Sequence, residues 1–209
     1  MITVCWAAKG GAGTTVTTAS LALAQSAGGL LVDLAGDVPA VLGIEAAGRA
    51  GIFDWIASDA EPDRLAQLEL DVTPDLRIVP TGDGAPPTSP ARWERLATHL
   101  AADPRHVIVD AGTGEPPTAL AKRADARLLV TRACYLALRR TQALVTRPTG
   151  VILIEEPGRA LTATDVQLAV GAPVVATVLL DPKIARAADA GLLTARLPAA
   201  CLDELRRAA

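Results

Sequence analysis

Short apolar runs and longer amphipathic stretches alternate along almost the whole chain. The apolar runs have five to seven residues and predict buried strands. These predicted strands are residues 2–8, 29–33, 76–80, 106–110, 126–131, 150–154 and 173–179. Apolar residues at helical spacing predict helices at residues 14–25, 51–57, 90–102, 116–123, 136–145, 162–170, 183–190 and 198–208. The alternation continues almost to the end of the chain, and the sequence shows no internal repeat.

The order of these elements predicts an α/β fold. Strands that alternate with helices favour a mostly parallel, twisted sheet, here of about seven strands, with helices on both faces. The chain has 209 residues, of which 50% are hydrophobic, so one sizeable core can form. We therefore expect residues 1–209 to be a single domain. Only 2% of the residues are aromatic, so aliphatic side chains must fill most of that core.

Charge and composition narrow the classes of function. The formal net charge of −3 and the pI of about 5.4 argue against a strong nonspecific nucleic-acid surface, so DNA binding is disfavoured. The three cysteines are isolated, which indicates neither a zinc site nor a disulfide framework. We find no signal peptide and no apolar run that approaches the length of a membrane span, so we expect a cytoplasmic protein. Residues 198–209 are too weakly apolar for stable membrane anchoring and are expected to dock on the protein's own core.

A glycine-rich loop follows the first predicted strand. Residues 9–15 read Lys-Gly-Gly-Ala-Gly-Thr-Thr and lead into the first predicted helix. Glycines turn the chain tightly there, and the start of the helix offers backbone N–H groups to a phosphate. A glycine-rich turn in some other α/β protein is the alternative. Because Lys9 is one of only three lysines in the chain, its place in this loop favours a phosphate loop.

The loop resembles the deviant Walker A motif of the ParA/MinD family of P-loop ATPases, which usually reads Lys-Gly-Gly-x-Gly-Lys-Thr-Thr. The resemblance implies that Lys9 reaches the partner's phosphates in an ATP-sandwiched dimer and that Thr15 binds Mg²⁺. Thr14 stands where the second lysine belongs, so it brings no positive charge to the β- and γ-phosphates. The nucleotide-binding positions that the resemblance implies in this loop are Gly10, Gly11, Ala12, Gly13, Thr14, Thr15 and Val16.

The second predicted strand ends on Asp33. In the resembled family this strand carries Asp-x-Asp, and a carboxylate there positions the attacking water. Asp33 matches the first acidic position, and Ala35 takes the place of the second. Asp37 follows two residues later and could substitute, so the catalytic candidates are Lys9, Asp33 and Asp37. A turn or a helix cap before Pro39 is the alternative role for Asp37.

The predicted strand at residues 106–110 ends on Asp110, and Gly112 and Gly114 follow it. This is a Walker B pattern, in which an apolar strand delivers one carboxylate to the hydration shell of Mg²⁺. Asp110 and Thr15 are therefore the predicted metal ligands. The two glycines would form a segment that responds to the γ-phosphate.

The resemblance continues in the C-terminal half. Residues 151–159 lie where the family's strand delivers an Asn to adenine, and the matching position here is Glu155 or Glu156. Residues 179–191 are similar to the segment that passes beside the base, which places Asp181 and Pro182 there. The implied cofactors are ATP or ADP with Mg²⁺. Within the family, the chain is most similar to the CpaE/TadZ-like branch, whose members also often lack the second lysine.

Two functions follow from these residues. The first is an ATP-dependent dimerisation switch in intracellular positioning or partitioning, with slow or impaired hydrolysis, a nucleotide-bound homodimer and a protein partner. The second is a pseudo-ATPase scaffold, which Thr14, Ala35 and the missing Asn favour. In both cases the chain is at most a weak ATPase. A metabolic P-loop enzyme is a third possibility, but no second substrate constellation supports it.

Overall fold

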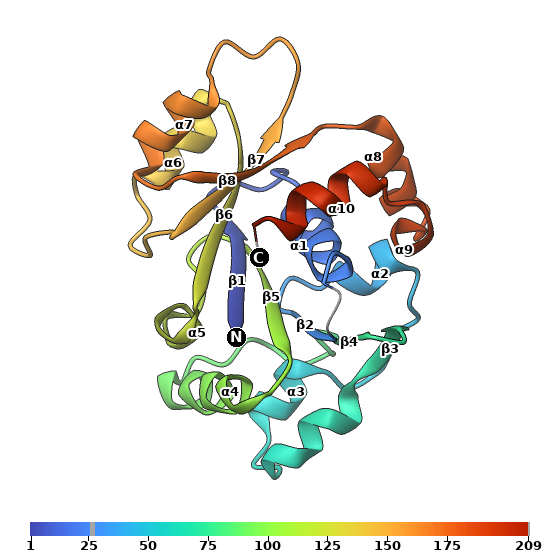
Figure 1. Ribbon diagram of the computed structural model, residues 1–209. Helices are drawn as coiled ribbons and strands as arrows, with labels where there is room; N and C mark the ends of the chain where they lie inside the picture. The colour runs from blue at the N-terminus through green and yellow to red at the C-terminus, as the bar shows by residue number, and fades with distance from the viewer. Residues whose placement is uncertain (26–27, 209) are drawn as a thin grey trace.

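A central β-sheet organises the molecule. The computed structural model describes residues 1–25 and 28–208 of the chain. The sheet has eight strands in the order β3-β4-β2-β5-β1-β6-β7-β8 (Figure 1). In chain order the strands are β1 (Ile2–Ala7), β2 (Gly29–Asp33), β3 (Leu70–Thr73), β4 (Leu76–Val79), β5 (His106–Thr113), β6 (Ala126–Arg132), β7 (Gly150–Glu155) and β8 (Val174–Leu179). The predicted α/β fold is confirmed; residues 26, 27 and 209, which the single-domain prediction includes, lie outside the described residues.

Strand β3 is the one that the hydrophobic pattern does not predict. It pairs antiparallel with β4 at the edge of the sheet, whereas the other pairings are parallel. It has only four residues and none of them is fully buried, so it lacks the apolar run that marks the other strands. Its sequence signal is a short Leu-x-Val alternation followed by a Pro-Asp turn.

Arg105 links this edge of the sheet to β5 through hydrogen bonds. Its guanidinium donates to Glu69 at 2.8 and 2.6 Å and to Asp103 at 3.0 and 2.7 Å. The two carboxylate side chains are only 11% and 12% exposed. These hydrogen bonds raise the pKa of Arg105. Because Glu69 directly precedes β3 and Arg105 directly precedes β5, the contact fixes the edge hairpin.

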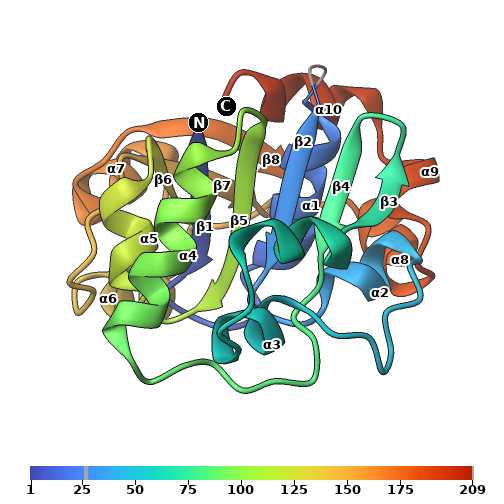
Figure 2. The ribbon, with the colours of Figure 1, turned by 90° about the horizontal axis from the view of Figure 1, so that it is seen from below.

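Helices cover both faces of the sheet (Figures 1 and 2). On one face lie α1 (Thr14–Leu23), α2 (Val38–Leu42), α8 (Pro182–Asp189), α9 (Leu193–Arg196) and α10 (Ala199–Arg206). On the other lie α3 (Ile52–Ala57), the 3₁₀ helix η1 (Pro62–Leu68), α4 (Pro90–Ala102), α5 (Thr118–Arg123), α6 (Tyr135–Thr141) and α7 (Ala163–Val170). Successive strand side chains point to opposite faces and so supply two largely aliphatic cores.

Most helices lie close to their predicted ranges, and α4 matches its range. Helix α6 ends at Thr141, before the predicted end at residue 145. The Glu115 carboxylate accepts the N–H groups of Val145 and Thr146, which takes those amides out of a continued helix. The sequence pattern does not predict α2, η1 and α9: α2 and α9 have only five and four residues, and η1 is a 3₁₀ helix, which lacks the α-helical period of 3.6.

Helix α2 packs against α8 and α9 through a glycine contact. It ends at Gly43, which has a φ of 73° in the left-handed region. A Cβ atom on Gly43 would lie 2.2 Å from the backbone oxygen of Gly191. Both the backbone conformation and the close approach therefore require glycine at this position.

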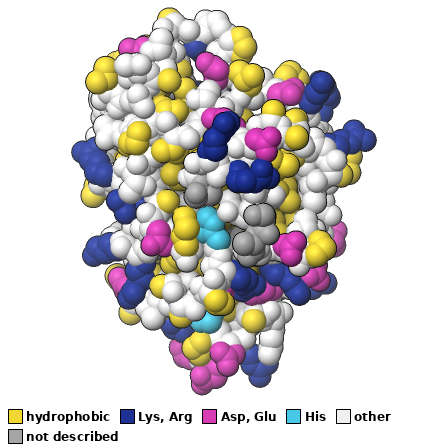
Figure 3. Space-filling model, in the orientation of Figure 1, with side chains coloured by type: hydrophobic (Ala, Val, Ile, Leu, Met, Phe, Trp, Pro, Cys, Tyr) yellow, Lys and Arg dark blue, Asp and Glu magenta, His cyan; other side chains and the backbone are white. Residues whose placement is uncertain are grey.

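The C-terminal helix α10 docks on α1 and β8, as the sequence predicts. Leu205, on the inner side of α10, is fully buried. The Glu204 carboxylate accepts from the Thr177 N–H at 3.0 Å, and the Arg206 Nε donates to the Ala24 oxygen at 3.2 Å. On the face seen in Figure 3, basic and acidic side chains are interspersed. None of the helices within residues 1–25 and 28–208 is long and apolar enough to cross a bilayer.

The strand order fixes where loops can meet. Strand β1 lies between β5 and β6, so the chain reverses its direction of travel across the sheet next to β1. In open parallel sheets, ligands bind outside the carboxyl ends of the strands at such a switch point. The loops that follow β1, β2 and β5 converge there, and they carry the candidate residues.

Candidate nucleotide-binding site

The glycine loop forms an open cradle at the carboxyl end of β1. Gly11 and Gly13 have φ angles of 76° and 92°, and a Cβ atom on Gly10, Gly11 or Gly13 would meet no neighbouring atom within 4 Å. Helix α1 begins at Thr14 without a side-chain cap and without an acidic residue in its first turn. The N–H groups of this first turn therefore remain available to an anion, which is how helix N-termini bind phosphate.

A cavity of about 500 Å³ lies between the glycine loop and the loops after β2 and β5. Five of the predicted nucleotide positions reach it: Gly11, Gly13, Thr14, Thr15 and Val16. Its other walls include Ala35, Asp37 and Gly112. Gly10 is exposed beside the cradle, and Ala12 faces a second cavity. The predicted phosphate loop and the loops that follow Asp33 and Asp110 thus enclose one space, which we call the phosphate cavity after the predicted loop.

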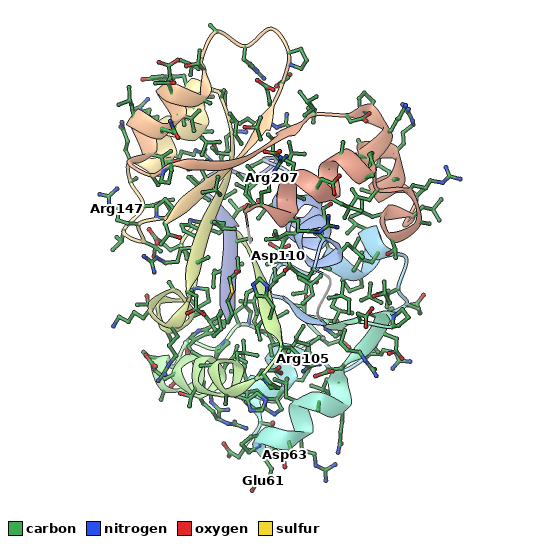
Figure 4. All side chains as sticks on the ribbon, viewed as in Figure 1. Glu61, Asp63, Arg105, Asp110, Arg147 and Arg207 are labelled. Atoms are coloured by element: carbon green, nitrogen blue, oxygen red, sulfur yellow. The ribbon has the colours of Figure 1, made fainter. Side chains whose placement is uncertain are left out.

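Asp110 lies in the interior, where β5 faces α1 (Figure 4). It is fully buried, and its Oδ1 accepts from the Gly112 N–H at 3.0 Å. Its Oδ2 is also buried and has no hydrogen-bond partner. Burial raises the pKa of Asp110 to about 6, although the Gly112 N–H and the Thr15 hydroxyl oppose the shift. A buried carboxylate oxygen without a donor fits a site that a cation or its bound water completes.

No group of three or more His, Cys, Asp or Glu side chains in the described part of the chain is arranged to hold a metal ion. A Mg²⁺ ion at Asp110 would therefore need the Thr15 hydroxyl, waters and ligand phosphates as further ligands. Mg²⁺ commonly binds in this way, with one or two protein groups and substrate oxygens. The residues present fit that ion.

Asp33 and Asp110 are register partners on neighbouring strands, but their carboxylates differ in environment. Asp33 Oδ1 accepts from the N–H groups of Ala35 and Gly36 at 2.9 and 2.8 Å. Its Oδ2 accepts from the Val38 N–H at 3.2 Å. Burial nevertheless raises the pKa of Asp33. The Asp33 carboxylate thus holds the loop after β2, and it does not line the phosphate cavity.

Asp37 is the acidic side chain that lines the cavity from this loop. It occupies the N-cap position of α2, but its side chain makes no cap hydrogen bond. Asp37 is exposed, whereas Ala35 offers only a methyl group to the same cavity. Of these two aspartates, the structure therefore places Asp37, and not Asp33, on the wall of the cavity.

Lys9 lines neither of the two cavities at this edge of the sheet. Its Nζ donates to the Gly10 oxygen at 3.3 Å, and the side chain is partly exposed. Thr14, at the position of the usual second lysine, is 7% exposed. No cationic side chain in the described chain lines the phosphate cavity, so the glycine loop offers dipoles rather than charge there.

A second cavity, of about 210 Å³, continues from the glycine loop between α1, α8 and α10. Gly13 and Val16 line both cavities. Asp181 lines this second cavity, and its Oδ1 accepts from the Lys183 N–H at 2.7 Å. Pro182 begins α8 but does not line it. Of the two residues predicted in this segment, the structure brings Asp181 to the cavity.

Glu155, the predicted contact to the base, lines neither of these two cavities. Strand side chains alternate between faces, so Ile154 lines the second cavity while Glu155 borders a separate pocket with Glu156 and Arg159. Sequence reasoning did not single out Arg132, which does line the second cavity. The signal for Arg132 is its position at the carboxyl end of β6, next to the strand that precedes the glycine loop.

Solved ATPase structures of the ParA/MinD type share this fold. The ParA family ATPase of Chlorobium tepidum TLS superposes with a TM-score of 0.74 and 18% identity, over 97% of this chain and 96% of that chain. MinD in the MinC:MinD complex of Aquifex aeolicus superposes with a TM-score of 0.77 and 19% identity, over 99% of this chain and 94% of that chain. MinD with Mg-ADP from Pyrococcus horikoshii OT3 superposes with a TM-score of 0.76 and 19% identity, over 99% of this chain and 93% of that chain.

No protein-family model and no curated protein sequence matches the chain. At such low identity the structural likeness defines the fold, which is that of a P-loop NTPase of the ParA/MinD type. The CpaE/TadZ-like branch stays a prediction.

Proposed function

We propose that this chain binds a nucleoside triphosphate with Mg²⁺, ATP by the resemblance of its loop, and acts as a dimerisation switch with slow hydrolysis. The observation that carries the proposal is the fully buried Asp110 carboxylate, which lies near the Thr15 hydroxyl in the first turn of the uncapped helix α1, and whose Oδ2 makes no hydrogen bond to any described residue. A buried carboxylate oxygen without a hydrogen bond destabilises the protein, and a bound cation would offset that cost.

Each part of the site has a role in this proposal. The backbone N–H groups of the glycine loop and of the first turn of α1 hold the phosphates. Thr15 and Asp110 hold Mg²⁺, which would neutralise charge on the phosphates when bound. Thr14 donates a hydroxyl hydrogen bond in place of an ammonium group. Nucleotide therefore binds more weakly than to a loop with both lysines.

Slow hydrolysis follows from the loop after β2. The methyl side chain of Ala35 cannot accept a hydrogen bond from water, so Asp37 is the residue proposed to orient the attacking water. Asp37 is exposed, and water competes for its carboxylate. It therefore holds the attacking water less firmly than a carboxylate on the strand end would.

Lys9 is proposed to act across a dimer interface. It lies next to Gly10, is partly exposed and lines neither of the two cavities described above. An ammonium group in that position can reach phosphates held by a second copy. The MinD structure of Aquifex aeolicus is a complex with the protein MinC, which supports the idea that a fold of this type also binds a protein partner. Intracellular positioning or partitioning is the proposed process.

A pseudo-ATPase scaffold is the second candidate. The observation in its favour is that, among the described residues, the side chains that line the phosphate cavity include an acidic one, Asp37, and none that is cationic. Without Mg²⁺, bound phosphates would face uncompensated negative charge. Weak or absent nucleotide binding would then leave a folded platform for protein partners.

One experiment separates the two. Calorimetric titration with Mg-ATP and Mg-ADP is combined with mass measurement by light scattering and with phosphate release. Binding with a shift to dimer in ATP, and loss of that shift in Lys9→Ala, supports the switch. Phosphate release should fall in Asp37→Ala and persist in Asp83→Ala, an exposed control on a neighbouring loop. If neither nucleotide binds, the switch is refuted and the scaffold remains; if Lys9→Ala dimerises like the wild type, the role of Lys9 across the interface is wrong.

A further inference from the structure

A groove lies between α5 and the segment that joins α6 to β7. It has a volume of about 510 Å³ and shares no residue with the phosphate cavity or the second cavity. We call it the α5 groove. The residues that line it include Glu115, Lys122, Arg127, Val145, Thr146 and Arg147. Figure 4 shows Arg147 at the edge of the molecule. The groove is therefore separate from the candidate nucleotide-binding site.

The α5 groove is basic, although the whole chain has a formal net charge of −3. Its cationic residues are Lys122, Arg127 and Arg147, and Glu115 is the one acidic residue among the described residues that line it. Within the described chain, none of the three cations forms an ion pair. Unpaired cations gathered in one concave place attract an anionic ligand.

The charge of Glu115 is engaged within the protein. Its carboxylate accepts the N–H groups of Val145 and Thr146. Although desolvation opposes the shift, these hydrogen bonds and the charge of Arg147 lower the pKa of Glu115. Glu115 thus holds the segment after α6 against the loop after β5. That loop joins the phosphate cavity, which Gly112 lines, to the α5 groove.

Backbone contacts hold Arg127 in place. Its N–H donates to the Thr149 hydroxyl at 2.9 Å, and its carbonyl oxygen accepts from the Thr149 N–H at 2.8 Å. Its Nε donates to the Arg147 oxygen at 2.9 Å. The two Nη atoms make no hydrogen bond to a described residue, and they are not among the buried atoms without a partner. They are therefore accessible, and such a fork of N–H donors suits a carboxylate.

Val145 adds an apolar surface to this basic groove. It is 85% exposed, the largest exposed fraction among the large hydrophobic residues that the structure describes. Inorganic phosphate or the backbone of a nucleic acid would leave this side chain in water. A peptide that carries an apolar side chain beside its carboxylates would cover it. The combination of cations and an exposed apolar side chain therefore favours a peptide.

We propose that the α5 groove binds a segment of a protein partner in which acidic side chains flank an apolar one. One carboxylate of that segment accepts from the Nη atoms of Arg127, a second pairs with Arg147, and the apolar side chain covers Val145. The inference rests on the proposed function in that it names the chemistry of the protein partner proposed there, for the switch and the scaffold alike.

The test begins with random peptides displayed on phage and selected on the immobilised full chain without nucleotide. We expect the recovered peptides to be enriched in Asp and Glu next to Leu, Ile, Val or Phe. One of them is synthesised with a fluorescent label and titrated by anisotropy against the wild type, Arg127→Ala, Arg147→Glu and Val145→Ser. Arg139→Ala is the matched control, because Arg139 is an exposed arginine on the neighbouring helix α6 that does not line the groove.

The expected effects differ between the variants. The dissociation constant of the peptide should rise about tenfold in Arg127→Ala, because a charge-assisted contact is lost. Arg147→Glu should raise it roughly tenfold or more, because like charges then face each other. Val145→Ser should raise it about threefold, through lost apolar contact. Arg139→Ala should bind like the wild type, and added salt should weaken binding to the wild type.

The outcomes decide the inference by themselves. It is overturned if the recovered peptides carry no excess of acidic residues, or if Arg127→Ala or Arg147→Glu binds them as tightly as the wild type. If Val145→Ser has no effect, or if inorganic phosphate or a DNA duplex binds as tightly as the peptide, the groove is a plain anion site and the inference is also overturned. Urea unfolding of each variant checks the fold.

Two features keep this test independent of other failures. The Arg147 side chain makes no hydrogen bond to a described residue, so Arg147→Glu probes the groove even if Arg127→Ala is unstable. Nucleotide is absent from every step. A chain that binds no nucleotide would refute the switch and leave this inference standing, whereas failed peptide binding would refute this inference and leave nucleotide binding untouched.

Discussion

Replacing Asp110 with asparagine tests whether the site holds a destabilising charge. Burial raises the pKa of Asp110 from 3.8 to about 6 in the folded protein. In the unfolded chain the pKa returns to about 3.9. Between these two values the folded state binds more protons than the unfolded state. The free energy of unfolding therefore falls as the pH rises from about 4 to about 6, and stays lower above that.

The size of the effect follows from the shift. Each pKa unit corresponds to about 1.4 kcal/mol, so ionised Asp110 destabilises the fold by about 3 kcal/mol at neutral pH. Asparagine removes the charge and keeps an oxygen that can accept from the Gly112 N–H. We expect Asp110→Asn to raise the free energy of unfolding by about 1–3 kcal/mol at pH 7.5, and by about half as much at pH 5.

The assay is urea unfolding of both proteins at pH 5 and pH 7.5, without nucleotide. Asp59→Asn is the control, because its carboxylate is 98% exposed and should give no such change. If Asp110→Asn is no more stable than the wild type at pH 7.5, or gains equally at both pH values, the reasoning is wrong. Adding Mg-ATP should stabilise the wild type more than Asp110→Asn, because the charged carboxylate attracts the metal more strongly than an amide does.

Three further predictions concern the loop, the sheet edge and a helix end. Thr14→Lys restores an ammonium group at the phosphates and should lower the dissociation constant for Mg-ATP roughly 10- to 100-fold by calorimetry; an unchanged value would argue that the cavity does not hold phosphates. Arg105→Ala leaves two nearly buried carboxylates unpaired and should lower the free energy of unfolding by about 2–3 kcal/mol, and Arg105→Lys by less, in urea titrations. Gly43→Ala should cost about 2–4 kcal/mol in the same assay, because its Cβ would meet a backbone oxygen at 2.2 Å; wild-type stability would show that α2 can shift away from Gly191.

Local pattern was sufficient for most of the fold. The parallel strands are continuous apolar runs because both of their faces are covered, and such runs are visible in the sequence. Strand β3 was missed because it lies at the edge, is half-exposed and has only four residues. The end of α6 could not be predicted either. It depends on the Glu115 carboxylate, which is distant in the sequence from the amides that it binds.

The candidate site, like the fold, could be predicted from the sequence only in part. The sequence identifies the glycine loop, Thr15 and Asp110, because a strand, a tight turn and a helix in succession already place them at one edge. It does not distinguish Asp33 from Asp37. That distinction depends on the fold of the loop after β2, in which Asp33 accepts three backbone N–H groups and Asp37 faces the cavity.

What the sequence by itself determined is the order of most strands and helices and the position of the glycine loop, since both depend on residues that are neighbours along the chain. Only the tertiary structure decided which distant side chains share a cavity. A step of one residue along β7 exchanges Ile154 for Glu155 at the second cavity, because side chains alternate between the two faces of a strand. Arg132 reaches that cavity because β6 pairs with β1, a contact between segments more than 120 residues apart that no local pattern encodes.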